Sequence, residues 1–222
     1  MFRKLKRNLA GRESRAVRQL ATPALLLALL LSSFSSFATP RDAPALEAFR
    51  SKLVAAAVER ASHAVRYDPS YVAIPYPNGD VPSETGVCSD EIIRIYRVLG
   101  IDLQKEVHED IASDPAAYGK RRADANIDHR RVENLIIFFR RHGESLPITD
   151  RAGDYQPGDI VTWDLHNGQG SVQGHIGMVV DRQTFWTKRY KILHNIGDGP
   201  QIEDVLFDWK ITGHFRYSGT TK

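Results

Sequence analysis

The sequence predicts an α+β fold in which N-terminal helices pack on a small antiparallel sheet. Apolar residues recur at helical spacing in the first part of the chain, between residues 45 and 141. Short runs rich in β-branched and aromatic residues follow only after residue 156. Helices first and strands afterwards are typical of the α+β class. The length of 222 residues, with 42% hydrophobic and 26% charged residues, fits a soluble globular protein.

Residues 1–38 have the three parts of a signal peptide: a basic stretch ending at Arg18, the apolar run 25–31 and small residues near Ala38. The apolar run is shorter than the roughly 20 residues that span a bilayer. We therefore expect cleavage after Ala38, a periplasmic or secreted protein and no stable membrane insertion; an uncleaved anchor is the alternative. Seven of the 30 lysines and arginines lie in this leader. The rest of the chain is slightly acidic, which argues against nucleic-acid binding.

Four helices are expected before the strands. Residues 39–64 form a connector and the first helix, and a loop rich in Pro, Gly, Asn and Asp follows at 67–86. The second helix starts at Ser89 or Asp90, which are good N-cap residues, and stops at Gly100. The other two helices are expected at 103–118 and 132–141.

Four strands are expected after these helices, at 160–163, 176–180, 190–194 and 211–217. The second and third are separated by a loop and can pair as a hairpin. Antiparallel neighbours bring the start of one strand beside the end of the next. Such a hairpin would place His175 and His194 near the same end of the sheet.

Cys88 is the only cysteine, so it can form no internal disulfide in an oxidising compartment. It stands directly before the second predicted helix, where unpaired N–H groups and the helix dipole favour the thiolate and a nucleophilic role. A thiolate nucleophile needs a base and an orienting group, which His175 and His194 can supply. The structural alternatives are a small buried apolar cysteine and two histidines that only hold the fold together.

Four segments, in order, resemble the motifs of NlpC-type cell-wall peptidases, which belong to the papain-like clan. These are Pro-Tyr-Pro-Asn-Gly at 75–79, Val-Cys-Ser at 87–89, Gln-Pro-Gly-Asp-Ile-Val at 156–161 and Gly-His-Ile-Gly-Met-Val at 174–179. The resemblance covers residues 67–195. It implies a papain-like fold, with residues 65–222 as the catalytic domain, joined in one domain with the preceding helix. It also implies hydrolysis of amide bonds in peptidoglycan stem peptides through a thioester acyl-enzyme.

Carried over to this chain, the resemblance makes Cys88 the nucleophile, His175 the general base and acid, and His194 the residue that orients His175. It also puts Tyr76 near the oxyanion site. Those peptidases usually carry an aspartate directly before the nucleophile, where it anchors a substrate amine, and this position is Val87 here. The further candidates for substrate or oxyanion binding are Ser89, Asp90 and Asn195.

Two other functions stay open: a non-catalytic module that binds cell-wall glycan or a partner, and an acyltransferase with the same triad. We expect a monomer that acts on peptidoglycan peptides, with no cofactor and no metal. A zinc hydrolase motif is missing, because the His108-Glu109 pair is followed by alanine, not histidine, at position 112. The basic runs 120–122 and 129–131 are interpreted as solvated faces, or else as a cleft wall that binds substrate carboxylates.

Overall fold

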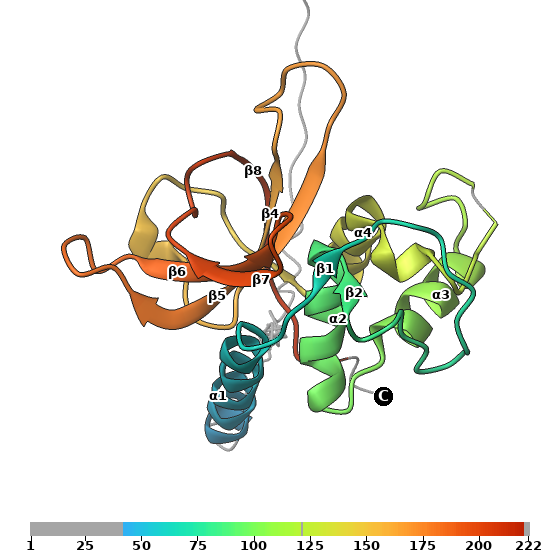
Figure 1. Cartoon of the computed structure of the whole chain (residues 1–222), viewed down its shortest axis with the longest axis horizontal. Helices are drawn as coiled ribbons and strands as arrows, with labels where there is room; N and C mark the ends of the chain where they lie inside the picture. The colour runs from blue at the N-terminus through green and yellow to red at the C-terminus, as the bar shows by residue number, and fades with distance from the viewer. Residues whose placement is uncertain (1–41, 121, 220–222) are drawn as a thin grey trace, which may run out of the picture. The chain divides into compact units, whose positions relative to one another are not determined.

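Helices precede the main strands along the chain in the computed structural model, which describes residues 42–120 and 122–219 (Figure 1). These residues all belong to one compact unit. The leader at 1–38 and its expected cleavage site lie outside the described residues. The helices are α1 (Asp42–Arg60), α2 (Cys88–Val98), α3 (Leu103–Ser113) and α4 (Val132–His142), with 3-10 turns η1 (Asp128–Arg130) and η2 (Ala152–Asp154).

The main sheet has six strands in the order β3-β8-β4-β5-β6-β7, and every neighbouring pair is antiparallel. Helices packed on an antiparallel sheet confirm the predicted α+β class. A separate two-stranded parallel pair, β1 with β2, precedes α2. The strands are β1 (Arg66–Tyr67), β2 (Thr85–Gly86), β3 (Glu144–Ser145), β4 (Ile160–Asp164), β5 (Gly174–Gln183), β6 (Tyr190–Asn195), β7 (Pro200–Glu203) and β8 (Lys210–Arg216).

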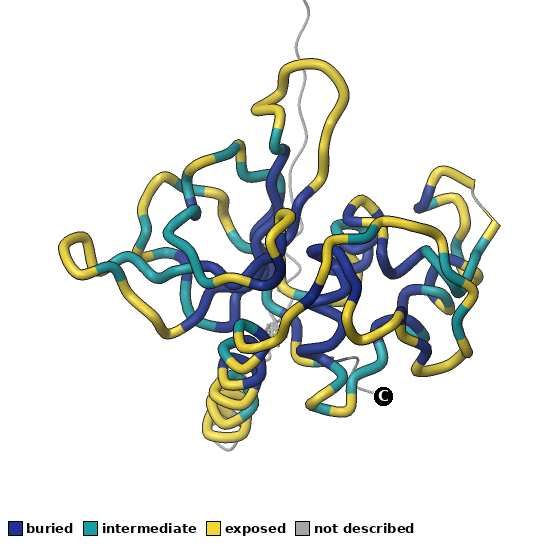
Figure 2. The backbone as a smooth tube through the Cα atoms, in the orientation of Figure 1, coloured by how far each residue is buried: buried dark blue, intermediate teal, exposed yellow. Residues whose placement is uncertain are grey.

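The core lies on both faces of the sheet. On one face α1, α2 and α4 pack against β5, and α2 also reaches β6. Figure 2 shows the backbone of α2 and of the central strands as buried. Alternate residues of β5, such as Ile176 and Met178, join the cluster below the helices, while Val179 joins a second cluster around Trp163 on the other face. The period of two in a strand therefore separates a helix-covered face from a second face.

The structure differs from the predicted elements at the end of α3 and in four short strands that were not predicted, β1, β2, β3 and β7. α3 ends at Ser113 instead of residue 118, because Asp114 precedes Pro115 and leaves the helical conformation, with φ −141° and ψ 71°. A residue before proline is disfavoured in the α region. The unpredicted strand β7 begins at Pro200 and lies at the sheet edge, where proline is tolerated. Among the described residues, no helix combines the length and apolar character of a membrane span.

Candidate functional site

Cys88 is the first residue of α2, and local hydrogen bonds fix its position. Val87 has the extended backbone of an N-cap residue. Its N–H donates to Oδ2 of Asp90 over 2.7 Å, which closes the first turn of the helix. Since α2 packs on β5, the sulfur of Cys88 meets the main-chain N–H of Ile176, the residue after His175. The fold thus brings the thiol to the start of β5.

The acid–base state of Cys88 is the opposite of the one predicted from its helix position. The residue is 4% exposed, and burial raises the pKa of its thiol to about 12. Hydrogen bonds from the N–H groups of Ile176, Ser89 and Cys88 itself lower this pKa, but by less than burial raises it. Desolvation of the anion therefore outweighs the helix N-terminus, and the resting form is the neutral thiol.

The two predicted histidines lie together. His175 on β5 and His194 on β6 are 2% and 1% exposed, and Nε2 of His175 is 2.9 Å from Nδ1 of His194. On the far side of this pair, Nε2 of His194 is 3.0 Å from Oε2 of Glu203 on β7. The arrangement is a continuous chain of hydrogen bonds from one ring to the other and on to a carboxylate.

A glycine allows the two strands to hold these rings so close. A Cβ at Gly177 would lie 2.6 Å from Cγ2 of Ile192 and 2.8 Å from the carbonyl oxygen of Leu193. Any side chain there would push β5 away from β6 beside His194. The absence of a side chain at this position thus supports the contact between the rings.

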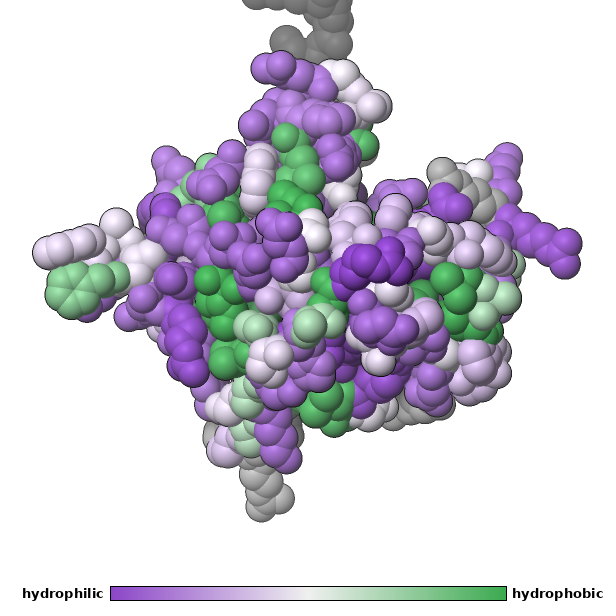
Figure 3. Space-filling view, viewed as in Figure 1, coloured by the Kyte–Doolittle hydropathy of each residue, from purple (hydrophilic) through white to green (hydrophobic). Residues whose placement is uncertain are grey.

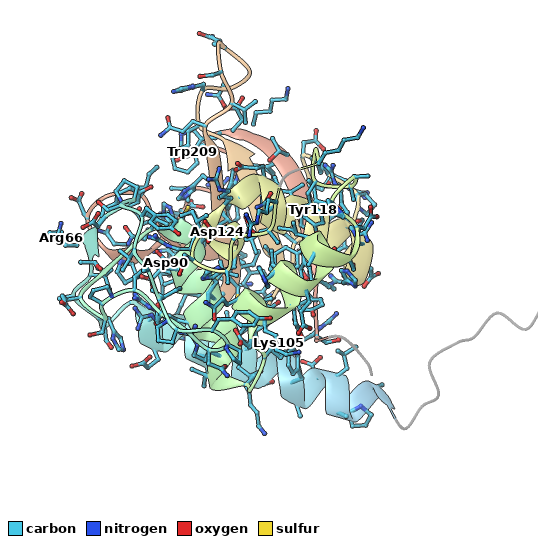
Figure 4. The ribbon with its side chains drawn as sticks, turned by 90° about the vertical axis from the view of Figure 1, so that its right-hand side faces the viewer. Arg66, Asp90, Lys105, Tyr118, Asp124 and Trp209 are labelled. Atoms are coloured by element: carbon cyan, nitrogen blue, oxygen red, sulfur yellow. The ribbon has the colours of Figure 1, made fainter. Side chains whose placement is uncertain are left out.

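Tryptophan rings cover the histidine pair. The ring centres of Trp163 and Trp209 are each 5.9 Å from that of His175, and Trp209 is 6.1 Å from His194 (Trp209 is labelled in Figure 4). Burial lowers the pKa of His175 to about 3. It also lowers the pKa of His194, although the charges of Glu203 and Asp208 oppose the shift. Both rings are therefore neutral near pH 7.

The tyrosine that lies near Cys88 is Tyr67, whereas the resemblance had pointed to Tyr76. Tyr76 packs on α3: its ring centre is 5.0 Å from that of His108 and its hydroxyl is 3.5 Å from Oε1 of Glu109. Burial raises the pKa of Tyr67, and so do the electrostatic interactions with Cys88, in its thiolate form, and with the carboxylate of Asp90. Tyr67 comes close because β1 pairs with β2, setting it opposite Gly86, two residues before Cys88.

Ser89 and Asp90 hold the helix start in place and are not free for a substrate. The hydroxyl of Ser89 donates to the carbonyl of Arg130 over 2.7 Å. Both carboxylate oxygens of Asp90 accept from the Arg130 guanidinium, at 2.9 and 3.0 Å, and Figure 4 labels Asp90 within this region. The prediction of a solvated basic face at 129–131 was wrong for His129 and Arg130, which are both buried. The ion pair with Asp90 accounts for the burial of Arg130.

Asn195 is fully buried at the end of β6, with one unused donor. Its Oδ1 accepts from the N–H of Gly197 over 3.2 Å, while its Nδ2 has no hydrogen-bond partner among the described residues. The Met178–Leu193 pairing of β5 and β6, continued by two residues, sets Asn195 opposite Ile176. Asn195 therefore shares the helix-covered face with the residue whose N–H meets the sulfur.

Glu203 and Tyr67 are the two residues of this site that sequence reasoning missed. Glu203 lies on β7 and Tyr67 on β1, and both strands are too short for a hydrophobic pattern to predict them. Within residues 42–120 and 122–219, no three His, Cys, Asp or Glu side chains are grouped so that they could hold a metal ion.

Comparison with known proteins gives a family and one close relative. A family model described as "Domain of unknown function (DUF1287)" matches residues 54–217. "Uncharacterized protein YijF" of Escherichia coli (strain K12) is 44% identical over 203 residues, which are 89% of this chain and 97% of that protein. Two solved structures from Trichomonas vaginalis, NlpC1 and NlpC2, are each 16% identical, with TM-scores of 0.43 and 0.44 over 77% and 76% of this chain. The chain spans 44% and 47% of those two, less than half their length.

Proposed function

This chain belongs to the DUF1287 family, and from that premise we propose that it is a cysteine hydrolase that cleaves amide bonds in peptidoglycan stem peptides. The observation that carries the proposal is the hydrogen-bonded pair His175–His194 at the start of β5, where the thiol of Cys88 meets the adjoining main chain. The ordered motifs that resemble NlpC-type peptidases supply the substrate class and the papain-like assignment. The proposal includes export through the leader at 1–38 and action as a monomer.

The first chemical step follows from the neutral state of both partners. As the sulfur of Cys88 attacks the amide carbon, the S–H proton moves to the ring of His175, a C–S bond forms and the carbonyl π electrons move to oxygen. The imidazolium of His175 then gives this proton to the leaving nitrogen, the C–N bond breaks, and an amine and a thioester result. No stable thiolate–imidazolium pair is needed beforehand.

The second step releases the acid. His175, neutral again, takes a proton from a water molecule whose oxygen attacks the thioester carbon. When the tetrahedral intermediate collapses, the C–S bond breaks, the sulfur recovers a proton from His175, and the product is a carboxylic acid. Atoms and charges balance without a cofactor or an oxidant.

In this proposal three donors stabilise the oxyanion. The main-chain N–H of Cys88 belongs to the first turn of α2, where N–H groups lack helical partners. The Nδ2 of Asn195 is buried without a partner among the described residues, which costs roughly 1–3 kcal/mol unless a ligand accepts from it. The phenol of Tyr67 lies within electrostatic range of the sulfur. Because Cys88 is 4% exposed, a substrate carbonyl can reach these groups only when neighbouring side chains move.

The decisive experiment compares cleavage of purified sacculi by the protein and its variants, with released fragments identified by mass spectrometry. We expect Cys88→Ala and His175→Ala to abolish fragments that the unaltered protein releases. His166→Ala is the matched control, because His166 is a histidine in the β4–β5 loop outside this site. Fragments that persist with Cys88→Ala, or no fragments with the unaltered protein from sacculi of every chemotype, would contradict the proposal.

One observation favours a binding role as the second candidate. Phe185 and Trp186, at the tip of the β5–β6 hairpin, are 73% and 87% exposed, and this hairpin projects from the sheet (Figures 1 and 3). Exposed aromatic rings can lie flat on sugar rings. A binding module would retain sacculus binding and its biological effect in Cys88→Ala but lose both in Trp186→Ala. An acyltransferase would give a new amide where a hydrolase gives a free carboxylate.

A further inference from the structure

The hydrogen bonds around His194 determine which ring nitrogens carry protons. A carboxylate can only accept, so the contact of 3.0 Å between Oε2 of Glu203 and Nε2 of His194 requires the proton on Nε2. A neutral imidazole carries one N–H, so Nδ1 of His194 is bare. This Nδ1 is 2.9 Å from Nε2 of His175, which must then be the donor. It follows that Nδ1 of His175 is also bare and can accept a proton.

We propose that Glu203 is a positioning residue: acting through His194, it fixes the tautomer that leaves Nδ1 of His175 free to take the proton of Cys88. The assignment of that proton transfer rests on the proposed hydrolase function. The assignment of the tautomers does not depend on that function: it rests on the hydrogen-bond chain and on the neutral state of both rings. Burial supports it, because both rings are held neutral, the only state in which a tautomer choice exists.

The other groups that face His194 do not fix its tautomer. His175 on β5 is neutral and can donate or accept, so it follows whichever state His194 adopts. Trp209, from the segment before β8, meets the ring in a T-shaped contact with the ring centres 6.1 Å apart. Asp208, next to it, acts on His194 through its charge, with no hydrogen bond to the ring given by the structure. Glu203 alone, of the described residues, forms a hydrogen bond to Nε2 of His194.

Glu203 reaches His194 because of the edge strand. His194 pairs with Gln201 in the β6–β7 register, and Glu203 lies two residues farther on the same face of β7. Its side chain is 42% exposed while His194 is 1% exposed. The carboxylate thus approaches the buried ring from its open side and accepts from Nε2 there.

The test reads the tautomers directly, by NMR of protein labelled with ¹⁵N in its histidine rings. In the unaltered protein we expect N–H at Nε2 of both His175 and His194. Glu203→Ala should redistribute the proton of His194 onto Nδ1, while Glu203→Gln should keep the original state because its amide oxygen still accepts. Asp208→Asn, which removes a nearby charge without touching the hydrogen bond, is the matched control and should leave the tautomers unchanged.

Activity gives the second readout. We expect kcat/KM on peptidoglycan fragments to fall about 10- to 100-fold in Glu203→Ala, by analogy with the loss seen when the hydrogen-bond partner behind a metal-binding histidine is removed. Glu203→Gln and Asp208→Asn should stay within about 3-fold of the unaltered protein, below the range just cited. An N–H at Nδ1 of His194 in the unaltered protein, or spectra unchanged by Glu203→Ala, would overturn the proposal. The expected tautomers together with no amide cleavage would instead overturn the proposed function and leave tautomer control by Glu203 standing.

Discussion

Cys88 should react slowly with thiol reagents at neutral pH, despite its place at the start of a helix. Burial raises the pKa of its thiol from 9.0 to about 12. At pH 8, a thiol of pKa 9 is roughly one-tenth thiolate, while one of pKa 12 is roughly one part in 10,000. The thiolate is the reactive form, so alkylation of the native protein should be about 1,000-fold slower than that of the unfolded chain.

The assay is alkylation by iodoacetamide, measured by mass spectrometry between pH 7 and 10. Cys88 is the only cysteine, so no other thiol contributes. The native rate should rise about tenfold per pH unit across the whole range, whereas the rate in denaturing urea should level off above pH 9. Low urea concentrations should leave the native rate unchanged, which would exclude reaction through the unfolded state. A native rate that levels off below pH 8, or that matches the unfolded chain, would refute this account of the site.

The same shift has a consequence for stability, whose sign follows from linkage. An acid with a raised pKa in the folded state loses its proton first in the unfolded state, so stability falls as pH rises above 9 and continues to fall toward about 12. At pH 10 the loss is about 1.4 kcal/mol. Cys88→Ala lacks this contribution, so its free energy of unfolding should fall less between pH 8 and 10 than that of the unaltered protein. The free energies of unfolding are measured by urea denaturation at each pH. An equal fall between pH 8 and 10 in Cys88→Ala and in the unaltered protein would contradict the raised pKa.

Three substitutions test other parts of the structure. Asp90→Ala leaves the buried guanidinium of Arg130 without its charge partner and should cost about 3–5 kcal/mol in urea denaturation; a cost below 1 kcal/mol would contradict this account of the pair. Gly177→Ala forces a Cβ against the carbonyl of Leu193 and should cost about 1–3 kcal/mol while altering the histidine ring signals in NMR. Asn195→Ala removes a buried donor that has no partner among the described residues, so it should change stability by no more than about 1 kcal/mol but lower kcat on sacculi about 100-fold or more. Unaltered turnover would remove Asn195 from the oxyanion site.

The elements that the sequence predicts well are those whose pattern is local. The apolar spacing of α2 and the apolar run of β5 each bury one side against the core, so periodicity identifies them. The strands β3 and β7 are two and four residues long, too short for any period to show. β3 also depends on β8, about 70 residues farther along the chain, and β7, although it directly follows its partner β6, begins at a proline that gives no strand signal.

The residues of the site were likewise predictable only where they lie on elements with a local sequence pattern. His175 and His194 could be brought together in advance, because hairpin pairing of two recognisable strands determines which ends meet. Glu203 and Tyr67 could not, since each reaches the site through a short strand at the edge of a sheet. The prediction of a thiolate at Cys88 was wrong for a different reason. The sequence indicates that Cys88 begins a helix, which favours the thiolate, but the burial that raises the pKa of the thiol depends on the whole fold.

The burial of the site makes control of the histidine tautomers necessary. In a site where Cys88 and His175 are both neutral at rest, charge attraction cannot orient the proton transfer, so the direction of each N–H must do so. Neutral imidazole has two tautomers of similar energy, and only one of them leaves an acceptor on His175. In our proposal the half-exposed carboxylate of Glu203 selects that tautomer by accepting a hydrogen bond from Nε2 of His194. A deeper carboxylate would raise the pKa of His194 and favour imidazolium, which has no bare nitrogen to accept from His175. The half-exposed position of Glu203 is thus the one that combines a fixed acceptor with two neutral rings.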